Sequence, residues 1–101
     1  MAFAGDMKAL QALMAAGDDL GKERPIEHTI RFDMREKRDA FARAMSNQGY
    51  RVAVGKSDNS VRCAKLDSID PFKITEMRLA LTTLAEEFGG DYAGWTTTVL
   101  H

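Results

Sequence analysis

The stretch LAEEFGGDYAGW, from Leu84 to Trp95, decides the fold of this 101-residue chain. Apolar residues at helical spacing lead into it, stop at Gly89 and Gly90, and give way to a short β-prone run with two aromatic residues. The helical stripe consists of Ile74, Met77, Leu81, Leu84 and Phe88. The stretch therefore predicts a helix, a tight break and a final strand.

Further back, IEHTIRF, from Ile26 to Phe32, alternates apolar with polar residues, which is typical of a half-buried strand. One face holds Ile26, Ile30 and Phe32 together with His28, and the other holds Glu27, Thr29 and Arg31. Asp33 stands as an N-cap, with Glu36 three residues later as in a capping box, so we expect a helix to begin at Met34. Its inner stripe is Met34, Phe41 and Met45, and Gly49 ends it.

Between the two long helices lies a predicted antiparallel hairpin. The segments YRVAV, Tyr50 to Val54, and VRCAKL, Val61 to Leu66, are rich in β-formers and flank the polar turn GKSDNS. Asp70 and Pro71 then supply the N-cap and the first residue of the second long helix.

The chain opens with a short amphipathic helix, predicted over residues 6–16, whose apolar face consists of Met7, Leu10 and Met14. A helix this short is marginal alone, so we expect it to dock on the rest of the protein. The next segment, GDDLGKERP, is rich in charge and turn formers. We therefore divide the chain into an N-terminal helix, residues 1–17, and one domain, residues 18–101.

The element order is a short helix followed by β-α-β-β-α-β. That order is typical of the ferredoxin-like fold, an α+β two-layer sandwich in which two helices cover one face of a four-stranded antiparallel sheet. The other face lacks these helices, so it must be solvated, covered by the N-terminal helix or used for binding. We therefore expect function on that face.

Composition restricts the classes of function. Hydrophobic residues make up 45% of the chain and charged residues 29%, an ordinary globular balance. The net charge of -1 gives no overall field toward nucleic acid, and Glu36 and Asp39 interleave with the basic residues of the first long helix. We predict no direct nucleic-acid partner.

Cysteine usage and the N-terminus bear on location. Cys63 is the only cysteine, so it forms no intramolecular disulfide, and its place in a strand favours a reduced, buried thiol. The first residues do not resemble a signal peptide. No apolar run approaches the ~20 residues of a membrane-spanning helix. We expect a soluble, cytoplasmic protein.

Few residues suit catalysis. The chain has two histidines, His28 and His101, and neither has a spacing that would build a zinc site with Cys63. We interpret His28 as a core-edge histidine with both ring nitrogens hydrogen-bonded, the alternative being a general base. We interpret Cys63 as an inert thiol, the alternative being a thiol activated by Arg62 and Lys65. No nucleotide-binding, hydrolase or metalloprotease motif is present, and we predict no enzyme activity, catalytic residue, metal or cofactor.

Tyr92 and Trp95 allow a different interpretation, because exposed aromatic residues on such a sheet hold single-stranded RNA. The predicted strand from Val61 to Leu66 has no aromatic residue, and we expect Trp95 to pack or to anchor its strand. An RNA-binding module, and a small-ligand or catalytic crevice near His28 and Cys63, remain the alternative hypotheses.

Four segments together resemble the family of the bacterial regulator of ribonuclease E activity B. They are IEHTIRF, QGYRV, LAEEF and YAGW, in that order, and the resemblance spans Asp18 to Val99. The signature residues in this sequence are Glu27, His28, Tyr92, Gly94 and Trp95. The resemblance implies a ferredoxin-like domain without enzyme activity or cofactor, whose best-known member binds ribonuclease E and restrains RNA cleavage.

The resemblance therefore implies a protein-binding regulator, with ribonuclease E or another RNA-processing enzyme as its partner. The sequence ends at His101 without the strongly acidic C-terminal extension of the best-known member, so we expect the fold to transfer better than the target. The candidate partner-binding residues are Glu27, Arg31, Arg51 and Arg62. They share one sheet face only if the strand registers agree. A homodimer through this face, or through the edge strand Tyr50 to Val54, is a further expectation.

Overall fold

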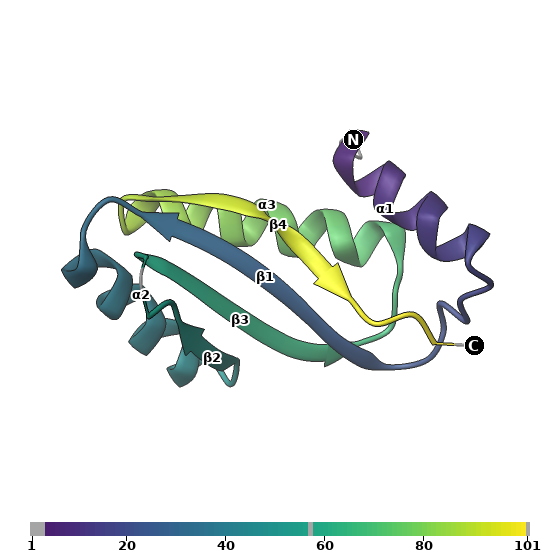
Figure 1. The fold of residues 1–101 in the computed structure, drawn as a ribbon, viewed down its shortest axis with the longest axis horizontal. Coiled ribbons are helices and arrows are strands. Elements are labelled where there is room, and N and C mark those ends of the chain that lie inside the picture. The colour runs from purple at the N-terminus through teal and green to yellow at the C-terminus, as the bar shows by residue number, and fades with distance from the viewer. Residues whose placement is uncertain (1–3, 57, 101) are drawn as a thin grey trace.

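The computed structural model describes residues 4–56 and 58–100, and its elements follow the expected order (Figure 1). They are α1 (Ala4–Ala15), β1 (Arg24–Phe32), α2 (Arg35–Asn47), β2 (Arg51–Val54), β3 (Ser60–Asp67), α3 (Pro71–Glu87) and β4 (Gly90–Thr97). Every strand pair is antiparallel, and the strand order in the sheet is β2-β3-β1-β4. The described part of the chain is thus an α+β protein with a four-stranded antiparallel sheet and three helices.

Both long helices pack on the same face of the sheet, which we call the covered face. Its main cluster of buried residues joins β1 and β3 to α2 and α3, and consists of Ile30, Phe32, Phe41, Met45, Val61, Cys63, Leu81 and Ala85. The aromatic rings interlock, because the centroid of Phe41 lies 5.3 Å from that of Phe32 and 5.6 Å from that of Phe88. The core therefore lies between the helices and one side of the sheet.

The start of α3 is as predicted. Asp70 is the N-cap, and its Oδ1 accepts hydrogen bonds from the main-chain N–H of Phe72 at 2.8 Å and of Lys73 at 3.2 Å. Pro71 occupies the first helical position, where no N–H is needed. This cap sets where the helix begins after β3.

The start of α2 differs from the prediction. The N-cap is Met34 rather than Asp33, it makes no side-chain cap hydrogen bond, and the helix begins at Arg35. The Asp33 carboxylate instead lies 3.5 Å from Lys37 Nζ. Met34, predicted as part of the inner stripe, is 47% exposed. The buried apolar stripe thus starts about two turns later, at Phe41, and continues at Met45; both side chains are fully buried.

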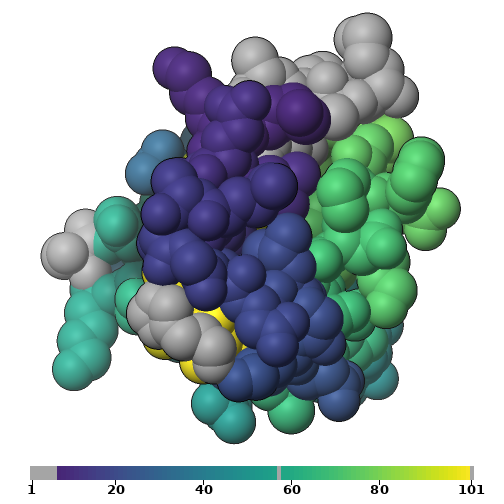
Figure 2. Space-filling view, turned by 90° about the vertical axis from the view of Figure 1, so that its right-hand side faces the viewer, coloured from purple at the N-terminus to yellow at the C-terminus, as the bar shows by residue number. Residues whose placement is uncertain are grey.

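α1 packs beside α3 on the covered side of the sheet, at the end where β4 finishes (Figures 1 and 2). Leu10 and Leu13 are buried there in a second cluster, which also contains Ile26, Ile69 and Ile74 and has Trp95 packed against it. The predicted face was wrong at two positions, since Met7 is 44% exposed and Met14 is 63% exposed. α1 therefore leaves the opposite face of the sheet uncovered.

Candidate functional site

The face of the sheet opposite the helices, which we call the open face, is set by the strand registers. Cross-strand partners point to the same side of a sheet, and alternate residues along each strand share that side. The open face consists of Pro25, Glu27, Thr29 and Arg31 on β1, Arg51 and Ala53 on β2, Ser60, Arg62, Ala64 and Leu66 on β3, and Asp91, Gly94 and Thr96 on β4. Each of these residues is exposed or half-buried. The registers thus bring all four candidate partner-binding residues onto one accessible surface.

The three arginines of the open face form a diagonal across the sheet. Arg51 on β2 lies opposite Ala64 of β3, and Arg62 is two residues from Ala64 along that strand. Arg62 in turn lies opposite Thr29 of β1, two residues from Arg31. Diagonal neighbours of this kind are roughly 7–8 Å apart, so their long side chains can act on one ligand together.

These arginines are not all neutralised within the chain. Among residues 4–56 and 58–100, neither Arg51 nor Arg62 has an ion pair within 4.0 Å. Arg31 is near Asp58, whose carboxyl pKa is lowered first by hydrogen bonds from Ser60 and then by the charge of Arg31. The open face therefore presents cations that a partner can pair, with Glu27 half-buried among them.

The signature aromatics, in contrast, point to the covered face. Tyr92 lies opposite Ile30 and Trp95 lies opposite His28, although the two aromatics are three residues apart in sequence. A β-bulge in β4 between these positions shifts the register by one residue, so both side chains fall on the same side. They pack on the core clusters, and the open face of the described chain carries no aromatic side chain.

Replacing Gly94 by alanine should destabilise the fold by about 1–3 kcal/mol. Gly94 has a φ of 134°, which L-residues rarely adopt, and an added Cβ would meet no atom within 4 Å, so the effect is one of backbone strain rather than collision. Urea denaturation measures it, with Ala93→Ser as the exposed neighbouring control, expected to change the free energy of unfolding by less than about 0.5 kcal/mol. Equal stability of the two variants would contradict this assignment.

His28 is held in the core by one hydrogen bond. The side chain is buried, and its Nδ1 lies 2.8 Å from the hydroxyl of Tyr92. Its Nε2 has no hydrogen-bond partner in the described parts of the chain, so the prediction that both ring nitrogens are bonded was wrong for this atom. Burial lowers the pKa of His28 to about 4, which keeps the ring neutral near neutral pH.

Cys63 lies directly opposite His28 on β3 and is fully buried. Burial, and secondarily the charge of Glu27, raise the pKa of the Cys63 thiol to about 12. A nucleophilic cysteine needs a lowered pKa and a base or cation beside an accessible sulfur. A protonated thiol facing a neutral imidazole in the core lacks these properties, and the arrangement suits an inert core thiol.

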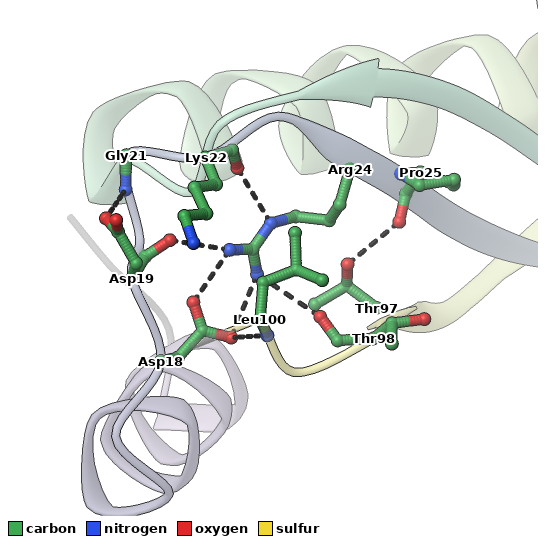
Figure 3. Close-up of polar contacts among 9 residues, drawn as sticks. All are labelled: Asp18, Asp19, Gly21, Lys22, Arg24, Pro25, Thr97, Thr98 and Leu100. Atoms are coloured by element: carbon green, nitrogen blue, oxygen red, sulfur yellow. Dashed lines mark hydrogen bonds and ion pairs between the residues drawn. The ribbon is translucent and has the colours of Figure 1, made fainter.

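A buried ion pair lies at the end of the sheet near α1, and the sequence pattern did not reveal it (Figure 3). Arg24 Nη2 lies 2.7 Å from Asp18 Oδ1, and Nη1 lies 3.0 Å from Oδ2, with both side chains almost completely buried. The Asp18 carboxylate also accepts from the N–H of Leu100 at 3.0 Å. The guanidinium donates to the main-chain oxygens of Asp19, Lys22 and Thr98. The pair thus joins the α1–β1 connection to the residues that follow β4.

In the described ranges, no three His, Cys, Asp or Glu side chains gather as metal ligands would. None of the described helices combines the length and apolar character needed to cross a membrane.

The seven elements, the bulge in β4 and the signature residues all lie in the part of the chain that matches one known family. The family described as Regulator of ribonuclease activity B matches residues 4–97, a range that contains all seven elements. Comparison with curated proteins gives no significant match. The resemblance noted from IEHTIRF and YAGW is therefore confirmed over nearly the whole chain, and the chain belongs to the Regulator of ribonuclease activity B family.

Proposed function

We propose that this chain is a non-enzymatic regulator that binds a ribonuclease through its open face and restrains RNA cleavage. Ribonuclease E, or another RNA-processing enzyme, is the proposed partner, and the contact is with protein rather than RNA. The family is one of regulators of ribonuclease activity. The observation that carries the proposal is the uncovered sheet face, on which Arg31, Arg51 and Arg62 form a diagonal beside Glu27.

The position of α1 supports this proposal. Leu10 and Leu13 bury their side chains on the covered side, against Ile74 and Trp95. A partner can therefore reach the open face without displacing α1. Oppositely charged groups arranged over an accessible surface favour a specific orientation and fast association with a complementary partner.

The two alternative functions find less support. An RNA-recognition module needs aromatic residues exposed on the sheet, whereas Tyr92 and Trp95 face the helices. A catalytic crevice needs reactive groups, whereas the His28 ring and the Cys63 thiol are both neutral and buried. Protein binding at the open face requires neither.

We also propose the ferredoxin-like class for this fold. The β-α-β-β-α-β order after α1, the central position of β1 and β3, and the packing of α2 and α3 on one face support it. Division into an N-terminal helix, residues 1–17, and a domain, residues 18–101, a cytoplasmic location and a homodimer through the sheet remain predictions. Light scattering at high protein concentration tests the last of these.

The chain should slow cleavage of a labelled RNA by purified ribonuclease E, and Arg62→Glu should raise the concentration needed for half-inhibition at least about tenfold. Arg62 is exposed and central in the diagonal, so its reversal replaces attraction by repulsion without touching the core. Initial cleavage rates at a series of regulator concentrations provide the measurement.

Arg43→Glu on α2 is the matched control, because it reverses an exposed arginine away from the open face. It should inhibit like the wild-type chain. If the wild-type chain leaves cleavage unchanged, the proposed partner is wrong. If Arg62→Glu and Arg43→Glu inhibit equally well, the open face is not the binding surface.

A further inference from the structure

β3 extends beyond β2 at one edge of the sheet. The pairing between them begins at Arg51, opposite Ala64. β3 continues through Lys65 and Leu66 to Asp67, and over these residues its only strand partner among the described residues is β1 (Figure 1). An unpaired stretch of strand can pair with another extended chain. The structure therefore contains a short free edge next to the beginning of β2.

The backbone of Leu66 faces that free edge. Gly55 N–H donates to Ser60 C=O at 2.9 Å, so the even-numbered residues of β3 direct their N–H and C=O groups toward β2. In this register, the position opposite Leu66 would be Gly49. The N–H of Gly49 donates instead to Ser46 C=O at 3.1 Å, at the end of α2. A donor and an acceptor of the sheet thus point at a position that no strand of the described chain occupies.

A groove of about 530 Å³ lies at this edge. It is lined by Pro25, Gly49, Tyr50, Arg51, Ala64, Lys65 and Leu66, which include two cations and no carboxylate. Lys65 Nζ lies 4.4 Å from the centre of the Tyr50 ring, and Leu66 is 66% exposed. Arg51 belongs to the open face and Lys65 to the other side of the strand, so carboxylates on either side of an incoming strand would meet a cation.

We propose that this groove binds an extended acidic segment of a protein partner, which pairs with β3 at Leu66 and extends the line of β2. The inference rests on the proposed protein-binding function and assigns it a second contact, at the edge of the sheet. In this mode of recognition, main-chain hydrogen bonds supply affinity and side-chain contacts supply specificity. Here the specificity comes from Arg51 and Lys65 for carboxylates and from Leu66 for an apolar side chain.

Other occupants fit the groove less well. A helix has already paired its main-chain groups and cannot satisfy those of Leu66. A second copy of this chain, paired edge to edge about a two-fold axis, would bring its own Arg51 and Lys65 to the same contact, where like charges repel. An extended acidic segment satisfies both the backbone and the charges.

The probe is a fluorescent octapeptide with the pattern leucine, glutamate, glutamate, leucine repeated twice, with acetylated and amidated ends so that only side-chain carboxylates remain. This pattern places glutamate and leucine on both sides of the strand. Fluorescence anisotropy should show saturable binding that weakens as salt is added. The same peptide with lysine in place of glutamate should bind at least about tenfold more weakly.

Two substitutions test the two parts of the proposal. Lys65→Glu should weaken binding of the glutamate peptide at least about tenfold through charge reversal. Leu66→Pro removes the N–H that faces the free edge while leaving the ladder with β1 intact, because proline is tolerated at such an edge position. It should abolish binding, whereas Leu66→Ala, which keeps the N–H, should retain part of it. Circular dichroism confirms that each variant is folded.

N-methylation of the peptide gives a readout that needs no protein variant. Two methylated peptides are compared, one with the odd-numbered and one with the even-numbered backbone amides methylated. One pattern should prevent binding and the other should leave it intact, because alternate amides of an added strand face the sheet. Undetectable binding of the glutamate peptide up to about 1 mM, the weak limit of specific recognition, would overturn the proposal. Equal effects of the two methylation patterns, or unchanged binding to Leu66→Pro, would overturn it as well.

The ribonuclease assay separates this inference from the proposed function. Arg62 does not line the groove, and Lys65 does not belong to the open face. If the octapeptide fails to bind while the chain still inhibits the nuclease in an Arg62-dependent way, the groove proposal is wrong and the proposed regulatory function is supported. If the peptide binds as expected while cleavage is unaffected, the groove proposal is supported and the proposed nuclease partner is wrong.

Discussion

Replacement of Arg24 by methionine should lower the free energy of unfolding by about 3–5 kcal/mol, because it leaves the Asp18 carboxylate buried without its counter-charge. The side chains of the pair are 1% and 0% exposed, so water cannot take the place of the guanidinium without local opening. Small domains are stable by only about 5–15 kcal/mol in total. The melting temperature should fall by at least about 12 °C, at the usual 4–8 °C per kcal/mol for a domain of this size.

Urea denaturation and thermal circular dichroism measure this loss, and two controls locate its cause. Lys37→Met breaks the exposed pair with Asp33 and should change the free energy of unfolding by less than about 1 kcal/mol. The double variant Arg24→Met with Asp18→Leu should be more stable than Arg24→Met alone, since it removes the buried carboxylate that has lost its counter-charge. A single variant within about 1 kcal/mol of wild type would show that the pair does not hold this end of the fold.

Acidification should destabilise the protein through the buried side chain of His28. Burial lowers the pKa of His28 from 6.5 to about 4 in the folded state. Between these two values the unfolded chain binds a proton that the folded chain does not, so stability falls as the pH is lowered. The stabilisation is fully present above pH 6.5 and decreases down to pH 4, with a total loss on the order of 3 kcal/mol.

The measurement is the free energy of unfolding in urea at several pH values from about 7.5 to 4, the window in which the linkage acts. His28→Gln, which cannot take up the proton, should flatten the dependence in that window. Asp58 also has a lowered pKa, but its ordinary value of 3.8 places its effect at the acidic end. An unchanged slope in the glutamine variant would show that another group is responsible.

Local sequence rules correctly predicted the features that depend only on neighbouring residues. The Asp70 cap and Pro71 act on their immediate neighbours, so the start of α3 needed no knowledge of the rest. Likewise, alternation in IEHTIRF assigned His28 to the apolar side and Arg31 to the other side, as the registers confirm. The agreement of the candidate partner-binding residues on one face follows from these registers, which the sequence could not supply.

The incorrect assignments involve competing local signals. α1 has apolar or small residues on several sides, so the pattern did not distinguish the face with Leu13 from the one with Met14, and only packing against α3 decides. At α2, Asp33 had the right residue type for a cap, but the helix starts one residue later and leaves it solvent-exposed. The exact first residue of such a helix depends on the position and direction in which the preceding strand ends.

The main features that escaped prediction are contacts between distant residues. Asp18 and Arg24 look like members of a solvated linker, and only the return of the chain at Thr98 and Leu100 encloses them. The free edge at Leu66 depends on where β2 ends relative to β3, which is a property of pairing rather than of either segment.

The bulge in β4 makes the interval between Tyr92 and Trp95 informative about other members of the family. In an unbroken strand, two residues three positions apart point to opposite sides. When a tyrosine and a tryptophan are three positions apart, with glycine just before the tryptophan, the sequence alone therefore indicates the extra residue of the bulge. A relative with an interval of two or four would keep both rings in the core only with a regular strand there, so the interval indicates which relatives share this local geometry.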